Sequence, residues 1–203
     1  MNFAGMIPLD ANVEIVHLDS NGNARPIFQE NRLGAYLVKF GYLSPHWINS
    51  FFAPLLSPFL GRWALSKNSR NIITNTGKAG AASRINGSGG EAAFTSIGQG
   101  TGVAAAAATD TALGTGVTAA GGADGGVHVL PTASVTASRV TTTVTNDTAQ
   151  LVGTVAETAT IAITESGVFN LDTAGVMIAR QVFTAINVVN GDSLQFTWKI
   201  KAA

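Results

Sequence analysis

Hydrophobic and polar residues alternate strictly near the C-terminal end of the chain, over residues 193–200. Leu194, Phe196, Trp198 and Ile200 occupy every second position, and the residues between them are Ser, Gln, Thr and Lys. Successive side chains of a β-strand point to opposite faces, so this pattern predicts a strand with one buried face and one solvated face. One strand cannot bury such a face alone, and the preceding residues must therefore supply the rest of a sheet.

The residues from 127 onward have the composition of consecutive short strands. Val, Ile and Thr are frequent, and turn-forming sequences separate the apolar runs, as in the Asn-Gly-Asp stretch just before residue 193. We therefore expect a mainly β protein with an antiparallel, sandwich or jelly-roll-like C-terminal domain. The predicted strands cover residues 127–130, 134–145, 150–156, 159–164, 176–185 and 193–200.

The N-terminal third has a different pattern. Residues 13–18 and 24–29 read as two strands of a hairpin around the turn at Asn21-Gly22. Leu33, Tyr36, Leu37 and Phe40 have helical spacing, which predicts a helix within residues 30–42. The change from aromatic to Gly, Thr and Ala-rich sequence near residue 68 predicts two domains, an N-terminal hairpin with a helical docking segment (1–68) and a β-sandwich (69–203).

Large apolar residues are concentrated between residues 45 and 63. Ser44-Pro45 and Ser57-Pro58 each have the residue pair of a helix start, so we expect short, strongly apolar helices. Such a segment is either the core of a small helical subdomain, a docking segment for a neighbouring subunit, or a membrane-surface element. The residues that would form a partner interface are Trp47, Phe51, Phe52, Leu55, Phe59 and Trp63.

The amino-acid composition indicates which classes of binding partner are not expected for this chain. Charged residues make up 12% of the chain, and 12 basic residues balance 12 acidic ones. Without a basic field, a nucleic-acid partner is not expected. The apolar run at 47–60 is interrupted by two prolines and is shorter than the ~20 residues that a membrane-spanning helix needs, so no membrane partner is expected either.

Sequence signatures of catalysis or cofactor binding are incomplete or missing. The glycines at 98, 100 and 102 are followed by Val103 where a dinucleotide-binding loop requires a third glycine, and we interpret them as a loop with positive φ. The histidines are widely spaced, at 17, 46 and 128, and there is no cysteine. We therefore predict no catalytic, cofactor-binding or metal-binding residues, and a protein that is not an enzyme.

Most of residues 71–200 resembles a recurring family of structural proteins of tailed bacteriophages. The aromatic run at 47–63 departs from that family's pattern. The stretches that carry the resemblance are IITNTGKA (72–79), RING (84–87), FTSIGQGTG (94–102), DTAL (110–113), RVTTTVTN (139–146), ITESGVF (163–169), ARQVF (179–183) and INVVNGDSLQFTWK (186–199).

The resemblance implies a non-enzymatic virion component, labelled in this family as structural, head-associated or tail-fibre-like. The expected location is the virion, and the expected role is that of a capsid decoration or cement subunit. A tail, neck or fibre component and a receptor- or carbohydrate-binding adsorption module are the alternatives. The expected partners are further copies of the chain, in a trimer or another closed ring, and other virion proteins such as the major capsid protein.

Overall fold

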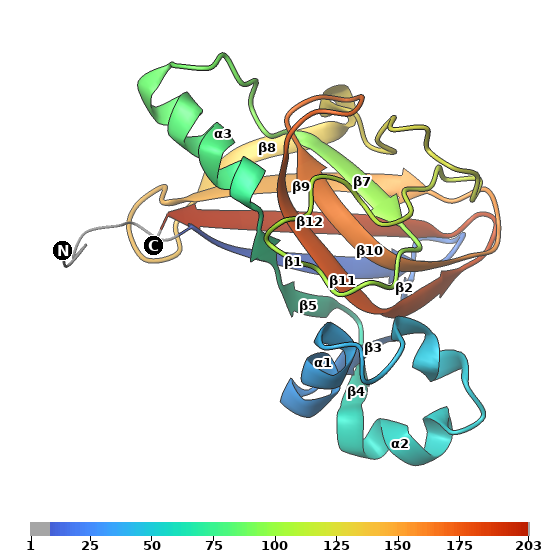
Figure 1. Cartoon of the computed structure of the whole chain (residues 1–203). Helices are drawn as coiled ribbons and strands as arrows, with labels where there is room; N and C mark the ends of the chain where they lie inside the picture. Colours follow the sequence, from blue (N-terminus) through green and yellow to red (C-terminus); the bar gives the residue numbers. More distant parts are fainter. Residues whose placement is uncertain (1–8, 203) are drawn as a thin grey trace.

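A computed structural model describes residues 9–202 of the 203-residue chain, and its largest element is an antiparallel sheet of six strands. The strand order is β2-β1-β12-β9-β8, and β5 also pairs with β1 (Figure 1). Its strands are β1 (Leu9–Leu18), β2 (Ala24–Arg25), β5 (Lys67–Arg70), β8 (Val135–Val140), β9 (Thr148–Ala156) and β12 (Ser193–Ala202).

A second antiparallel sheet lies across the first, in front of it in Figure 1. Its strand order is β6 (Ile72–Ile73), β11 (Met177–Val188), β10 (Ile161–Phe169) and β7 (Ser96–Gly100). One hydrophobic core is formed by side chains from both sheets. The prediction of a mainly β, antiparallel sandwich-like fold is therefore confirmed.

The alternating strand predicted at residues 193–200 is β12, and it lies near the centre of the six-stranded sheet. It pairs with β1 on one side and with β9 on the other. Leu194, Phe196 and Trp198 are fully buried, while the residues between them remain partly exposed. The alternation in the sequence thus correctly predicted a strand with one face packed on the core.

The predicted boundary at residue 68 does not separate two folding units. β1 was assigned to the N-terminal domain, but it pairs with β12 over its whole length, from Leu9 opposite Ala202 to Leu18 opposite Ser193. Its buried residues Ala11, Val13 and Ile15 belong to the core of the sandwich. The predicted hairpin is present, with its turn at the predicted position. Its return strand β2 has only two residues.

Residues 27–65 form a small lobe that projects from one end of the sandwich, at the bottom of Figure 1. It consists of the two-stranded sheet β3 (Ile27–Glu30) and β4 (Gly61–Ala64), the helices α1 (Arg32–Lys39) and α2 (Ala53–Leu60), and the 3-10 helix η1 (Pro45–Asn49). Ser44 caps η1 as predicted. Ser57-Pro58 does not start a helix, because Pro58 lies inside α2 and Pro54 occupies its first turn.

Loops rich in Gly and Ala cover the outer face of the four-stranded sheet. Residues 104–113 form a loop, and residues 127–130 make only isolated bridges where a strand was predicted. Helix α3 (Asn75–Asn86) packs against β11, and the 3-10 helix η2 (Thr132–Ser134) leads into β8 of the other sheet. This covering explains why β10 is buried at nearly every position and not at alternate ones.

Candidate docking surface

The small lobe has its own core, separate from that of the sandwich. Phe28, Val38, Trp47, Ala53 and Leu60 are buried together. The Phe28 ring meets Trp47 edge to face, with ring centroids 5.1 Å apart. Trp47 is therefore a core residue with only 4% of its surface exposed, and its assignment to a partner interface was wrong.

The other five predicted interface residues are all exposed on the lobe. Phe51 is 93% exposed, which is close to the exposure of an unfolded side chain, and its ring contacts only Phe52 edge to face at 5.6 Å among aromatic neighbours. Leu55 and Phe59 follow on α2, and Trp63 on β4 packs against the rim of the Phe28 ring. The lobe is too small to bury them, because its core is already filled by Trp47, Phe28 and Val38.

Helix α1 adds apolar residues that the sequence analysis did not assign to an interface. Leu33, Tyr36 and Phe40 have the helical spacing that predicts a buried stripe, yet they are exposed, and Gly34 and Val38 face inward instead. Gly34 determines this orientation, because a Cβ atom there would collide with the backbone carbonyl of Leu60. Only a residue without a side chain permits so close an approach of α1 to the end of α2.

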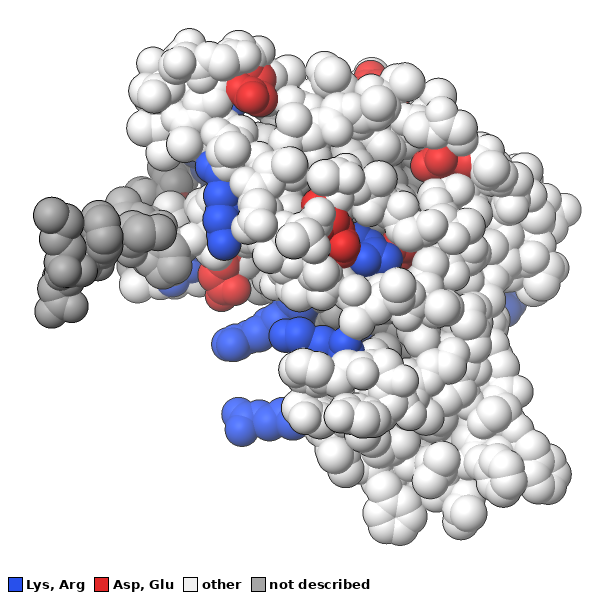
Figure 2. Space-filling model, viewed as in Figure 1, with Lys and Arg blue, Asp and Glu red and all other residues white. Residues whose placement is uncertain are grey.

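Together these side chains form what we call the aromatic surface. Tyr36 stacks on Tyr42 and packs against Phe40, at centroid distances of 6.4 and 4.6 Å, so part of the surface is held in a fixed arrangement. On the face drawn in Figure 2, the lowest part of the lobe shows no Lys, Arg, Asp or Glu. The aromatic surface consists of Leu33, Tyr36, Phe40, Tyr42, Phe51, Phe52, Leu55, Phe59 and Trp63.

A buried ionic contact fastens the lobe to the sandwich. Lys67 of β5 is fully buried, and its ammonium group donates to the carboxylate of Glu30 and to the carbonyl of Phe28, the latter at 2.9 Å. The second oxygen of Glu30 accepts from the Thr184 N–H of β11 at 2.8 Å. Burial lowers the pKa of Lys67, and the charge and hydrogen bond of Glu30 oppose that shift.

A pair of side-chain amides makes a second attachment. Asn187 of β11 donates to the side-chain carbonyl of Asn49 at 2.7 Å, and Asn49 donates back at 3.3 Å. With the Lys67 contact, this holds the lobe on β11 from two sides. The aromatic surface is thus carried on a positioned lobe, which favours docking because less freedom is lost on binding.

The densest polar cluster of the described residues lies elsewhere, under the loop at 101–116. Glu165 is fully buried and accepts hydrogen bonds from the N–H groups of Gly102, Gly114 and Thr115 at 2.7–3.0 Å. Arg180 donates to the same carboxylate at 2.7 and 2.9 Å and to Asp110 at 2.6 Å. Each charge is paired and hydrogen-bonded, so the cluster acts as a structural anchor for the loop.

This cluster also explains the glycines that resemble part of a phosphate-binding loop. Gly98, Gly100 and Gly102 do not have positive φ, so the prediction of a loop requiring that conformation was wrong. A Cβ atom at Gly100 or Gly102 would instead collide with the Glu165 carboxylate. The glycines leave room for a buried acid and its hydrogen bonds.

The three histidines do not meet in space. His17 is buried, and its Nε2 lies 2.8 Å from a carboxylate oxygen of Asp192. Burial raises the pKa of Asp192, but hydrogen bonds from His17 and the Val189 N–H outweigh it and leave the pKa below its ordinary value. His128 stacks on Phe169 with ring centroids 3.6 Å apart. Among residues 9–202, no three His, Asp or Glu side chains are grouped as metal ligands.

Comparison with known proteins gave no relatives, since no family model, no curated protein and no solved structure matches the chain. Within the part of the chain that the structure describes, no helix is both long and apolar enough to cross a membrane.

Proposed function

We propose that this chain is a non-enzymatic structural protein of a tailed-bacteriophage virion that decorates the outside of the capsid. Its resemblance to phage structural proteins over residues 71–200 and its sandwich-like fold support the proposal. The observation that carries it is the aromatic surface. Exposed apolar side chains gathered on one lobe cause aggregation unless another protein covers them.

The partner proposed for the aromatic surface is the outer face of the capsid shell, formed by the major capsid protein. The lobe projects from one end of the molecule, so attachment through it leaves the sandwich displayed on the particle (Figure 1). We further propose that copies of the chain associate in a trimer or another closed ring, because most homo-oligomers have closed symmetry.

A double substitution on the lobe tests the attachment. Phe51→Ser with Phe52→Ser removes two exposed rings without touching either core, so the fold should be retained. Aromatic residues at the centre of an interface contribute at least ~1 kcal/mol each, so co-sedimentation with capsids that lack the protein should weaken roughly 30-fold or more. Circular dichroism checks that the sheets remain folded.

The matched control removes two exposed apolar side chains outside the lobe. Ile85→Ser with Val144→Ser changes α3 and the loop after β8, and it should leave capsid binding unchanged. Equal binding by the lobe variant and the control would contradict the proposed attachment. Unfolding of the lobe variant would also contradict it, because Phe51 and Phe52 would then be internal residues.

A receptor- or carbohydrate-binding adsorption module is the second candidate. The exposed rings of Tyr36, Tyr42 and Trp63 favour it, because sugars stack on exposed aromatic side chains. Against it, most of the aromatic surface is Phe and Leu, which offer no hydrogen bonds to hydroxyl groups. Binding to purified capsids and not to host cell walls would decide for decoration, and the reverse for adsorption.

Electron cryomicroscopy of the particle tests the position on the virion. Density for the sandwich on the outer face of the capsid, with the lobe toward the shell, is the expected result. Density confined to the neck, the tail or a fibre would replace decoration by one of those roles.

A further inference from the structure

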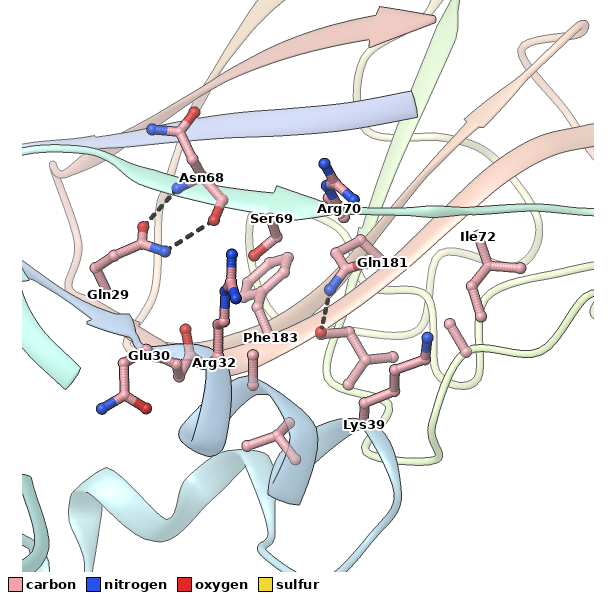
Figure 3. Close-up of a pocket in the computed structure, with 15 residues that line it drawn as sticks. Gln29, Glu30, Arg32, Lys39, Asn68, Ser69, Arg70, Ile72, Gln181 and Phe183 are labelled. Atoms are coloured by element: carbon pink, nitrogen blue, oxygen red, sulfur yellow. Dashed lines mark hydrogen bonds between the residues drawn. The ribbon is translucent and has the colours of Figure 1, made fainter. Parts of the chain in front are cut away.

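A cleft of about 290 Å³ lies between helix α1 of the small lobe and strands β5 and β11 of the sandwich (Figure 3). Its lining combines two kinds of side chain. Ala35 and Ile72 are accessible and provide apolar surface, beneath which Val38 and Phe183 are buried. Arg32, Lys39 and Arg70 are exposed and provide a basic rim.

The basic rim is not neutralised within the described residues. No carboxylate between residues 9 and 202 lies within 4.0 Å of the charged groups of Arg32, Lys39 or Arg70. The one acid in the lining is Glu30, and its two oxygens are already bound to Lys67 and to the Thr184 N–H. The cleft therefore offers positive charge without a matching negative charge.

The walls of the cleft are fixed by their own hydrogen bonds. Gln29 and Asn68 bond reciprocally across it, with the Gln29 amide donating to the Asn68 carbonyl at 2.8 Å and accepting from the Asn68 N–H at 2.6 Å. The Gln181 amide donates to the Val182 carbonyl at 2.7 Å. These acceptors are occupied, and Figure 3 shows Arg32 extending from the start of α1 toward β5. A ligand would meet a preformed site rich in free donors.

We infer that this cleft binds a short acidic peptide segment of another protein. Carboxylates would pair with Arg32, Lys39 and Arg70, and an apolar side chain would contact the accessible apolar lining at Ala35 and Ile72. The inference goes beyond the proposed virion role and does not depend on it. The basic rim and the aromatic surface share no residue, although they adjoin at Lys39, whose Nζ lies 5.8 Å from the Phe40 ring centroid.

Other ligands fit the cleft less well. No Trp or Tyr lines it, and the ring of Phe183 is buried with 1% exposed, so it has no platform on which a sugar or a nucleobase could stack. A second copy of this chain is also a poor match. The 12 acidic residues of the sequence are scattered, and no two of them are closer than four positions, which excludes an acidic run as a ligand.

Fluorescence polarisation of the whole protein with a labelled hexapeptide of alternating Asp and Leu tests this inference. We expect saturable binding with a dissociation constant below about 1 mM. Arg32→Gln with Arg70→Gln should weaken it roughly tenfold or more, since charge-assisted hydrogen bonds are lost. The control Arg62→Gln with Arg139→Gln changes the net charge equally at exposed sites outside the cleft and should leave binding unchanged.

Two further probes make the result decisive. A hexapeptide with Asn in place of Asp should bind at least about tenfold more weakly, because its neutral amides can accept hydrogen bonds from the basic rim but cannot form ion pairs with it. An oligothymidylate of eight nucleotides should bind no better than that neutral peptide. Failure of the acidic peptide to saturate, equal loss in both double variants, or tighter binding of the oligonucleotide would each overturn the inference.

Discussion

Phe196 shows how much of the stability rests on single core side chains. Its cross-strand neighbour on β9 is Gly153, which has no side chain to fill a void, and its neighbour on β1 is the buried Ile15. Phe196→Ala should therefore leave a cavity and lower the free energy of unfolding by roughly 3–5 kcal/mol. Urea denaturation measures this loss. Thr197→Ala on the outer face of the same strand is the control, and a similar loss there would contradict the assignment.

Glu157 gives the molecule a predictable dependence on pH. Only 1% of this residue is exposed, and neither carboxylate oxygen has a hydrogen-bonding partner within 3.5 Å. Burial raises the pKa of Glu157 from 4.5 to about 7, although a contact with Gln99 opposes the shift. The folded state therefore retains its proton between these two values, where the unfolded chain releases it.

The stabilising effect of this proton is complete below pH 4.5 and is lost as the pH rises through 7. We expect the Glu157 contribution to the free energy of unfolding to fall by roughly 1–3 kcal/mol over that range. The measurement is urea denaturation between pH 4.5 and pH 8, for the protein and for Glu157→Gln. The variant should gain stability mainly at pH 8, and parallel pH profiles of the two proteins would count against a neutral Glu157.

Residues 47 and 51 show that the sequence alone does not predict whether a single aromatic side chain is buried or exposed. Trp47 and Phe51 are both large aromatic residues in one apolar run, yet one is a core residue and the other is almost fully exposed. The number of large apolar residues between positions 45 and 63 correctly indicated that the lobe cannot bury all of them. Which of them is exposed depends on where Phe28 lies, and Phe28 comes from a different part of the chain.

At the scale of helices and strands, residue patterns predicted the type of element correctly where neighbouring residues alone determine it. The alternation at 193–200 and the turn before it predicted β12 correctly, because the pleat of a strand alone assigns side chains to faces. The spacing of Leu33, Tyr36 and Phe40 predicted helix α1 but not its orientation. Spacing shows which residues share a face, whereas the neighbouring backbone at Leu60, against which Gly34 packs, decides which face is buried.

Glu165 is a buried acid on which the loop at 101–116 depends. Glu165→Gln keeps the size of the side chain but leaves Arg180, itself buried, with Asp110 as its remaining carboxylate partner. Leaving a buried charge incompletely paired should lower the free energy of unfolding by roughly 3 kcal/mol. Amide hydrogen exchange at Gly102, Gly114 and Thr115 should also accelerate, because these N–H groups donate to Glu165.

The control for this substitution is Glu14→Gln. Glu14 lies on β1 and is partly exposed, so losing its charge should cost less than about 1 kcal/mol. Unchanged amide exchange in the Glu165 variant would show that the loop holds itself in place without the buried acid. The sequence contained one signal for this cluster, the alternating glycines at 98, 100 and 102, of which the first two lie in β7. It did not indicate which acid fills the space that they leave.

At the scale of the whole molecule, the small lobe is part of the same body as the sandwich. Its connection runs through Lys67, Glu30 and Thr184, which come from three distant stretches of sequence. The same holds for β1, whose partner β12 is at the other end of the chain. Sequence patterns predicted β1, β11 and β12 but not β5, and they did not predict which strands pair, because long-range pairing leaves no local periodicity.

The Lys67 contact provides a test of how the lobe is held. Lys67→Met keeps a long apolar stem but leaves Glu30 without its cation, in a place where the carboxylate is almost fully buried. The lobe should then open locally more often than the sandwich. Hydrogen exchange followed by mass spectrometry should accelerate roughly 100-fold in peptides covering α1 and α2, with little change in peptides from β12.

Two comparisons separate this explanation from general destabilisation. Lys199→Met, on the outer face of β12, removes one positive charge without breaking a described ion pair and should leave exchange in the lobe unchanged. Lys67→Met combined with Glu30→Gln should restore part of the protection, because no uncompensated buried charge remains. Equal acceleration in α1 and β12 would mean that lobe and sandwich open only together, and that Lys67 stabilises the whole fold instead of the attachment of the lobe.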